Sequence, residues 1–278
     1  MEKVSLYIPC YNCAQYLKQG LRAVFTQTYP VDEIIVVDDG SKDDTVKIAS
    51  GYPVRIISHP QNRGLAAARN TAVLNAKNNF VAAVDADCVP DNRWLEILMG
   101  HLDKDRDIVG CGGRVKETYT NSLPDKWRMY YLRQDLGEHV ILNPKNIYGS
   151  NSVFLKKALL DIGLYQERFK TNYEDFDLST RLLKKGYKLL YEPDAVVYHL
   201  KRDTVSSVLM TSWRWNFYGH YEPVNLINTL KSPFWTLQRV SDYMRGDLKQ
   251  RRFAFFILDC LLLLHNTYFN FKYYLKKK

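Results

Sequence analysis

The sequence has few cysteines, and their arrangement argues against two common kinds of site. Five cysteines in 278 residues, an odd number at irregular positions, do not suit a disulfide framework. A zinc site would need a second pair beside Cys10 and Cys13, and none is present. The single C-x-x-C leaves a thioredoxin-like redox motif as a less favoured alternative. Unpaired cysteines favour a reducing cytoplasm.

Two further absences concern targeting and nucleotide binding. The chain begins directly with the apolar segment 4–8, without the basic and apolar regions of a secretory signal. No G-x-G-x-x-G follows a predicted strand, which argues against a dinucleotide-dependent oxidoreductase. Residues 9–12 also lack glycine, whereas a sugar-nucleotidyltransferase, the nearest enzymatic alternative, would want a glycine-rich phosphate loop there. We therefore expect a cytoplasmic protein of another class.

Acidic residues are scarce only in the last part of the chain. Residues 201–278 contain 13 Lys and Arg against 5 Asp and Glu, a net charge of +8, whereas the first 200 residues contain 26 and 25. A basic tail of this kind is typical of proteins that bind nucleic acid or an anionic membrane surface.

Short apolar runs alternate with amphipathic segments through much of the sequence. Runs of Val and Ile bounded by polar turns, separated by helices, predict an α/β fold with a mostly parallel central sheet flanked by helices. The predicted strands are 4–8, 33–37, 54–58, 80–84, 108–111, 148–154, 187–192 and 195–198. The predicted helices are 15–28, 43–50, 65–76, 91–101, 125–135, 156–162 and 174–186.

Polar residues follow four of the predicted strands, in segments 9–12, 38–41, 62–64 and 85–87. Ligands bind at the carboxyl ends of strands in such sheets, so these segments should meet at one site. Asp85 and Asp87 stand two apart, and in extended backbone both carboxylates face the same way. Oxygen ligands at a strand end suit Mg²⁺ or Mn²⁺ with substrate phosphates, although a surface turn that caps the next helix is the alternative.

Three other positions have both a possible functional role and a possible structural role. Asp39 could accept a hydrogen bond from a base N–H such as uracil N3, with Tyr11 stacked on the base, or its segment could only cap a helix. Asp175 lies at a predicted helix start, where a carboxylate either caps or acts as a general base toward an acceptor hydroxyl. His199 follows an apolar strand and is either structural or a metal ligand.

Taken in order, these segments resemble the family 2 glycosyltransferases of the GT-A fold over about residues 3–200. The motifs that carry the resemblance are Pro9-x-Tyr11-Asn12, Asp38-Asp39-Gly40-Ser41-x-Asp43, Asn62-x-Gly64-x-x-x-Ala68-Arg69-Asn70, Asp85-x-Asp87 and Glu174-Asp175-x-Asp177-Leu178. The resemblance implies an inverting transferase that uses a nucleoside-diphosphate sugar, with a UDP-sugar favoured, and a divalent cation, Mn²⁺ or Mg²⁺. It also implies that 1–112 is the nucleotide-sugar-binding half and 113–200 the acceptor-binding half. The change to an aromatic, basic and apolar composition near residue 201 predicts a helical extension over 201–278.

The resemblance further implies a role for each matching residue. The implied catalytic base is Asp175, and the implied metal ligands are Asp87 and His199. The implied donor-binding residues are Pro9, Tyr11, Asp39, Asn62, Arg69 and Asp85. The acceptor-side candidates are Glu174, Arg214 and Trp215. Thr211 stands where processive members have the Gln of Q-x-x-R-W, so we expect transfer of one sugar to a glycan or lipid-linked acceptor.

The tail contains a nearly apolar segment, 253–264, between Arg251-Arg252 and the lysines 276–278. The run is shorter than the ~20 residues that a spanning helix needs. We expect peripheral association with the inner face of an anionic membrane, with Trp213, Trp215 or Trp235 toward the bilayer, or ordinary packing on the catalytic domain. A nucleic-acid-binding protein is the non-enzymatic alternative, but it leaves the acidic strand ends unexplained, so no nucleic acid is expected.

Overall fold

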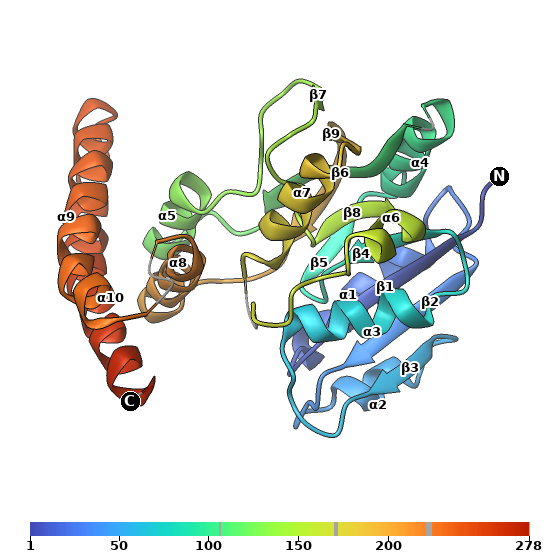
Figure 1. The fold of residues 1–278 in the computed structure, drawn as a ribbon, viewed down its shortest axis with the longest axis horizontal. Helices are drawn as coiled ribbons and strands as arrows, with labels where there is room; N and C mark the ends of the chain where they lie inside the picture. Colours follow the sequence, from blue (N-terminus) through green and yellow to red (C-terminus); the bar gives the residue numbers. More distant parts are fainter. Residues whose placement is uncertain (106, 170–171, 221–223, 278) are drawn as a thin grey trace. The chain divides into compact units, whose positions relative to one another are not determined.

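The computed structural model describes residues 1–105, 107–169, 172–220 and 224–277 of the chain, so Lys278 of the predicted basic flank lies outside the described residues. The chain divides into two compact units (Figure 1). Unit 1 comprises Met1–Thr118 and Gln134–Lys201, and unit 2 comprises Tyr119–Arg133 and Arg202–Lys278.

Unit 1 is built on one nine-stranded sheet with the order β3-β2-β1-β4-β8-β6-β9-β5, in which β7 also pairs with β9. Its strands are β1 (Val4–Cys10), β2 (Glu33–Asp38), β3 (Arg55–Ser58), β4 (Phe80–Val84), β5 (Cys88–Pro90), β6 (Ile108–Glu117), β7 (Ile141–Leu142), β8 (Asn151–Leu155) and β9 (Lys188–His199). The predicted α/β fold with a large central sheet is confirmed.

Parallel pairing is confined to two parts of this sheet. The strands β3, β2, β1 and β4 run parallel to one another, as the sequence predicted. Strand β8 then runs antiparallel between β4 and β6, while β6 and β9 are again parallel. Both short strands, β5 and β7, pair antiparallel with β9. The whole sheet is therefore mixed.

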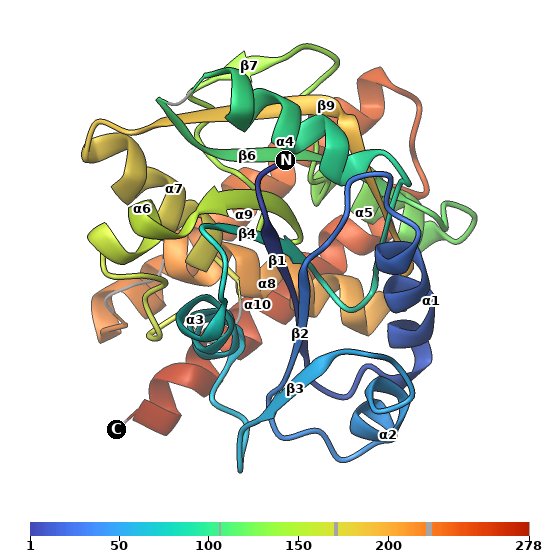
Figure 2. The same cartoon turned by 90° about the vertical axis from the view of Figure 1, so that its right-hand side faces the viewer.

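Helices cover both faces of the sheet, because the strand side chains alternate in direction and both faces are apolar. Leu6 and Ile8 of β1 pack in a core with helices on one face, and Tyr7 packs in a second core on the other. Figure 2 shows α1 and α2 on one side of β1 and β2 and α3 on the other. The helices of unit 1 are α1 (Ala14–Phe25), α2 (Thr45–Ala49), α3 (Leu65–Asn75), α4 (Trp94–Lys104), α6 (Lys156–Asp161) and α7 (Glu174–Lys184).

Several element boundaries differ from the predicted ones. The predicted strands 187–192 and 195–198 are one strand, β9, which bulges where β6 passes from Gly113 to Arg114. The predicted helix 91–101 begins later, at Trp94, because the Asp91 side chain accepts a hydrogen bond from the Arg93 N–H and forms a turn instead. β5 and β7 have three and two residues and therefore show no recognisable alternation.

Unit 2 is helical and consists of α5 (Leu123–Tyr131), α8 (Val205–His220), α9 (Leu226–Lys249) and α10 (Phe255–Lys277). Helices α9 and α10 pack against each other, and α10 also contacts α8 and α5. Segment 119–133, which the sequence assigned to the acceptor-binding half, lies in unit 2 because Trp127 and Leu132 are buried in its core. Among the described residues, no helix has the length and apolar character needed to cross a membrane.

Candidate active site

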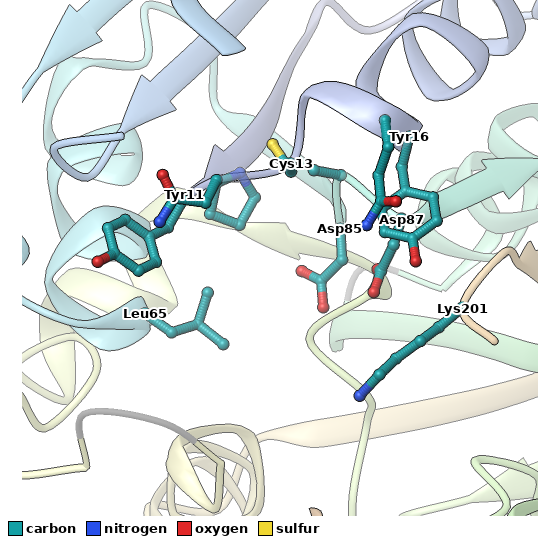
Figure 3. A pocket seen from close by; sticks show the side chains of 11 residues that line it. Tyr11, Cys13, Tyr16, Leu65, Asp85, Asp87 and Lys201 are labelled. Carbon is teal, nitrogen blue, oxygen red and sulfur yellow. The ribbon is translucent and has the colours of Figure 1, made fainter. Parts of the chain in front are cut away.

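The first and fourth strands of unit 1 end at a common pocket of about 340 Å³. Four of the predicted site residues line it, namely Pro9, Tyr11, Asp85 and Asp87. Figure 3 shows the two carboxylates pointing into the cavity, with the Tyr11 ring across from them. The Tyr11 side chain is half exposed, so one face of its ring is available to a flat ligand.

A short row of three side chains lies at one edge of this pocket. His199 Nε2 is 3.2 Å from the Asp87 carboxylate, and His199 Nδ1 is 2.7 Å from the Glu117 carboxylate. The antiparallel pairing of β5 with β9, which sets Cys88 opposite His199, brings these distant residues together. Burial alone would lower the pKa of His199, but the two carboxylates raise it to about 9. Burial likewise opposes ionisation of Asp87, yet His199 lowers the pKa of Asp87 to about 2.

These residues fit a divalent cation that is completed by a ligand. Asp87 and His199 offer one oxygen and one nitrogen side by side, and Glu117 fixes the orientation of the imidazole ring as outer carboxylates do in metal sites. Within the described parts of the chain, no group of three or more His, Cys, Asp or Glu side chains forms a complete metal site. Mg²⁺ is commonly held by one or two protein carboxylates together with substrate phosphates, so Asp87 and His199 could hold such an ion only together with a phosphate ligand.

Arg69 connects Asp85 to the beginning of α7. Its guanidinium is buried, donates to the Asp85 carboxylate at 2.8 Å, and lies 3.5 Å from the Glu174 carboxylate. It also donates to the Gly149 carbonyl at 2.6 Å. A side chain at position 149 would place its Cβ 2.8 Å from the guanidinium carbon, so glycine leaves the room that Arg69 needs. Burial raises the pKa of Asp85, against the opposing charge of Arg69.

The predicted base Asp175 and the acceptor-side candidate Glu174 open α7 after a strained turn. Tyr173, directly before the helix, has φ 76°, a left-handed conformation that is costly for a bulky residue. Asp175 accepts hydrogen bonds from the Gly149 N–H at 3.2 Å and from the Phe176 N–H at 2.8 Å. Burial raises the pKa of Asp175, although these donors and Arg69 act in the opposite direction. Burial and the neighbouring Asp175 carboxylate raise the pKa of Glu174 to about 8.

Asp39 lies deeper than a surface cap would. Its side chain is buried, and Oδ1 contacts His59 Nδ1 at 2.6 Å and accepts from the Arg63 N–H at 2.9 Å. Oδ2 accepts from the Gly64 N–H at 2.8 Å. The carboxylate therefore holds the loop between β3 and α3 in place. Asn62 of the same loop is exposed.

The acceptor-side candidates are split between the two units. Glu174 belongs to unit 1, whereas Arg214 and Trp215 lie on α8 in unit 2. Arg214 is exposed, and Trp215 packs against the helical core of its own unit. The structure thus joins Glu174 to the site through Arg69 and describes the other two only within unit 2.

Cys10 and Cys13 lie beside the pocket, and all five cysteines of the chain are free thiols. A hydrogen bond donated to Cys13, together with burial, raises the pKa of the Cys10 thiol, and the same hydrogen bond lowers the pKa of Cys13. Cys13 lines the pocket wall, and Cys10 is buried in the sheet core.

Glu117, Gly149 and Lys201 are among the residues of the site that were not identified from the sequence. Glu117 is the last residue of β6 and gave no signal, because its partner His199 is 82 positions away. Gly149 follows no motif, and its role becomes visible only through Arg69. Lys201 lines the pocket, and Figure 3 shows its ammonium group in the same cavity as Asp85 and Asp87. Its position two residues after His199 was the one available hint.

Comparison with known proteins agrees with this architecture. A family model described as Glycosyl transferase family 2 matches residues 5–163. The pre-mycofactocin glycosyltransferase of Mycobacterium tuberculosis is 32% identical over 207 residues, which cover 70% of this chain and 42% of that protein. The chain therefore spans less than half the length of this relative.

Two solved structures share the fold at low sequence identity. Residues 1–349 of S. aureus TarS in complex with UDP-GlcNAc superpose with a TM-score of 0.61 at 17% identity, covering 84% of this chain and 78% of that one. The mannosyltransferase PcManGT from Pyrobaculum calidifontis, in complex with GDP-Man and Mn²⁺, gives 0.66 at 18% identity, covering 96% and 86%.

Proposed function

The chain belongs to glycosyl transferase family 2, and from this premise we propose that it moves one sugar from a nucleoside-diphosphate sugar to a hydroxyl of a glycan or lipid-linked acceptor. The observation that carries the proposal is the convergence of Tyr11, Asp85, Asp87 and Lys201 on one cavity. An aromatic face, two carboxylates and an ammonium group are the groups that a base, a cation and a diphosphate require.

For the donor, we propose that Tyr11 and Pro9 line the base pocket and that Asp39 accepts the base N–H. Asp39 supports this assignment because each carboxylate oxygen has two lone pairs, and Oδ2 accepts a single hydrogen bond from the described residues. Asn62 and Arg69 are proposed beside the nucleotide and Asp85 beside the ribose. UDP is favoured, since uracil N3–H suits this acceptor.

The proposed divalent cation, Mn²⁺ or Mg²⁺, is held by Asp87 and His199. When bound, it neutralises the negative charge that develops on the leaving diphosphate. The Mn²⁺ in the PcManGT complex supports a divalent cation but does not bear on its ligands. Lys201 adds a second positive charge from the protein itself, because its ammonium group faces the same cavity.

In the proposed reaction Asp175 is the catalytic base. Its carboxylate removes the proton of the acceptor hydroxyl while that oxygen attacks the anomeric carbon from the face opposite the diphosphate. The bond from the anomeric carbon to the phosphate oxygen breaks, and its electron pair leaves with the diphosphate. One displacement of this kind inverts the configuration. The raised pKa of Asp175 makes it a better base than an exposed aspartate.

The first experiment is a donor panel: UDP-glucose, UDP-N-acetylglucosamine, UDP-galactose and GDP-mannose, each with Mn²⁺, Mg²⁺ or a chelator. We expect metal-dependent release of the nucleoside diphosphate from one donor. Release from no donor, or release that a chelator leaves unchanged, would contradict the proposal.

Asp175→Asn tests the base. We expect kcat to fall by about 10²–10⁴-fold, because the amide cannot take the acceptor proton, while the donor still binds. The matched control is Asp161→Asn, an exposed aspartate of α6 that pairs with Lys185. Turnover of the Asp175 variant equal to that of the control would exclude Asp175 as the base.

We also place the proposed activity in the cytoplasm, at the inner face of a membrane. The five free thiols are consistent with a reducing compartment. A lipid-linked acceptor would be reached there.

A further inference from the structure

Helix α9 of unit 2 reverses the usual distribution of polar and apolar side chains, although the unit also has an apolar core. In an ordinary surface helix the buried face is apolar and the outer face polar. In α9 the buried side chains are Thr229, Ser232, Thr236, Val240 and Asp247, so only one of the five is apolar.

In the first half of α9, most of the exposed side chains are apolar instead. The side chains of Ile227, Leu230, Phe234 and Leu237 are 48–68% exposed, and they recur every three or four residues. This spacing places them on one side of the helix. We call these four residues the α9 stripe.

Helix α10 has the same kind of outer face. Ile257, Leu261, Leu264 and Tyr268 are 37–68% exposed at spacings of four, three and four residues. We call them the α10 stripe. On its inner side this helix buries Asp259, Asn266 and Asn270 beside Leu258 and Leu262.

Polar groups hold the helices of unit 2 together. The Trp213 indole of α8 donates to Asn270 of α10 at 2.7 Å, and the Trp127 indole of α5 donates to Asp259 at 2.9 Å. Thr236 of α9 donates to its own helix backbone at 3.0 Å. Small and hydroxyl side chains between helices, with apolar side chains outside, are the pattern of helices that face lipid.

The charges of unit 2 are sorted in the same way. Of its described acidic side chains, Asp125, Asp203, Asp247 and Asp259 are buried, and only Asp242 is exposed. Its exposed basic side chains include Lys231, Arg245, Lys249, Arg251, Lys272 and Lys276. The outer surface is therefore apolar and basic, which complements an anionic lipid surface.

We propose that the α9 stripe and the α10 stripe bind the surface of an anionic lipid bilayer, with the basic side chains on its headgroups. Binding is interfacial, because no described helix is long and apolar enough to span. A second copy of the chain fits less well, since it would bring like basic charges together. The inference rests on the proposed function, because a lipid-linked acceptor would explain why the protein binds a membrane. Its test does not depend on catalysis.

The inserted side chains differ from those that the sequence suggested. Trp213 turns inward to bond Asn270, and Trp215 packs against the core of unit 2, so Leu, Ile and Phe face outward instead. An indole N–H that finds a partner inside the unit has no need of the lipid boundary.

The test is flotation of the full chain with vesicles of phosphatidylcholine alone or with 30% phosphatidylglycerol. We expect the protein to float with the anionic vesicles, and Phe234→Glu combined with Leu264→Glu to reduce binding by at least about tenfold. The matched control is Leu74→Glu, which changes an exposed leucine on α3 of unit 1 and should bind as the unchanged protein does.

Circular dichroism and thermal unfolding should be unchanged in these variants, because all three side chains are exposed. No flotation of the unchanged protein, or equal flotation of all variants, would overturn the proposal. Self-association in solution that the double variant abolishes would also overturn it, in favour of a protein interface. Donor turnover of the unchanged protein is measured in parallel without vesicles. If the protein floats with anionic vesicles but turns over no donor, the transferase proposal fails and the membrane proposal stands.

Discussion

At the scale of single residues, the site depends on side chains that hold other side chains. Glu117 orients His199, Gly149 makes room for Arg69, and Arg69 joins Asp85 to Glu174. None of these contacts belongs to a local motif, which is why the sequence revealed the reacting groups more readily than their supports.

The position of Glu117 predicts a defect in metal affinity. Glu117→Gln should weaken the apparent affinity for Mn²⁺ by about 10–100-fold, because the imidazole loses the carboxylate that fixes its orientation. The measurement is the initial rate of nucleoside diphosphate release against Mn²⁺ concentration. Glu96→Gln, at an exposed glutamate of α4 bound to Arg93, is the control. Identical Mn²⁺ curves for the two variants would refute the role of Glu117.

Lys201 predicts a defect in turnover. Lys201→Gln should lower kcat by about 10²-fold, since a positive charge near the leaving diphosphate is lost, and Lys201→Arg should restore part of it. KM for the donor should change less than kcat, because the charge on the diphosphate grows as the bond breaks. A variant that raises KM alone would show that Lys201 only binds the donor.

At the scale of elements, the close contact of β6 with β9 shapes the sheet beneath the site. Gly113 lies where the register between these strands shifts, and Asn151 of β8 accepts from the Gly113 N–H and donates to the Ala195 carbonyl. A Cβ at position 113 would lie 1.8 Å from that carbonyl oxygen. The obstructing atom belongs to the backbone, so a change of side-chain rotamer cannot relieve the clash.

Gly113→Ala should therefore destabilise the protein by roughly 3 kcal/mol or more, as overpacking in a core does. Thermal unfolding measures it. Gly100→Ala in α4 is the control, because nothing lies within 4 Å of its Cβ position and a helical alanine stabilises by about 0.5–1 kcal/mol. A melting temperature that rises in both variants would show that a Cβ at position 113 does not clash with the Ala195 carbonyl.

How much of the fold could be predicted from the sequence also depends on the element. The parallel strands β1, β2 and β4 were recognisable because each is a mostly apolar run between polar turns. Strand β5 has three residues and forms by pairing with β9, so no local sequence pattern predicts it. The sequence predicted a helical extension over 201–278 but not the exposed side of α9, because several apolar residues of this helix face outward, contrary to the usual pattern.

At the scale of the whole molecule, unit 2 contains a buried carboxylate pair. Asp247 accepts from the Arg252 guanidinium at 2.7 Å and from the Tyr131 hydroxyl, and Asp259 accepts from Trp127. Burial, with the nearby Asp247, raises the pKa of Asp259 from 3.8 to about 7. The neutral acid then shares a hydrogen bond with Asp247.

This pair predicts a pH-dependent stability. A raised folded-state pKa gives stability that is complete below pH 3.8 and is lost as the pH rises toward 7. Asp259→Asn keeps the shape of the neutral acid, so its melting temperature should depend less on pH between about 4 and 7 and exceed that of the unchanged protein at pH 8 by about 4 °C or more. Asp242→Asn, at an exposed and ion-paired aspartate, is the control. If the melting temperatures of all three proteins change equally with pH, the raised pKa of Asp259 is excluded.

The membership of α5 in unit 2 has a consequence for the order of synthesis. Trp127 emerges from the ribosome early, yet its hydrogen-bond partner Asp259 is made 132 residues later. The nascent chain must therefore carry a large uncovered indole while the remaining strands of the sheet are translated. Late contacts of this kind slow folding and expose apolar surface to aggregation. In a chain that stops before α10, Trp127 would stay uncovered. We therefore expect deletion of the last helix to reduce the yield of folded protein before it affects any activity.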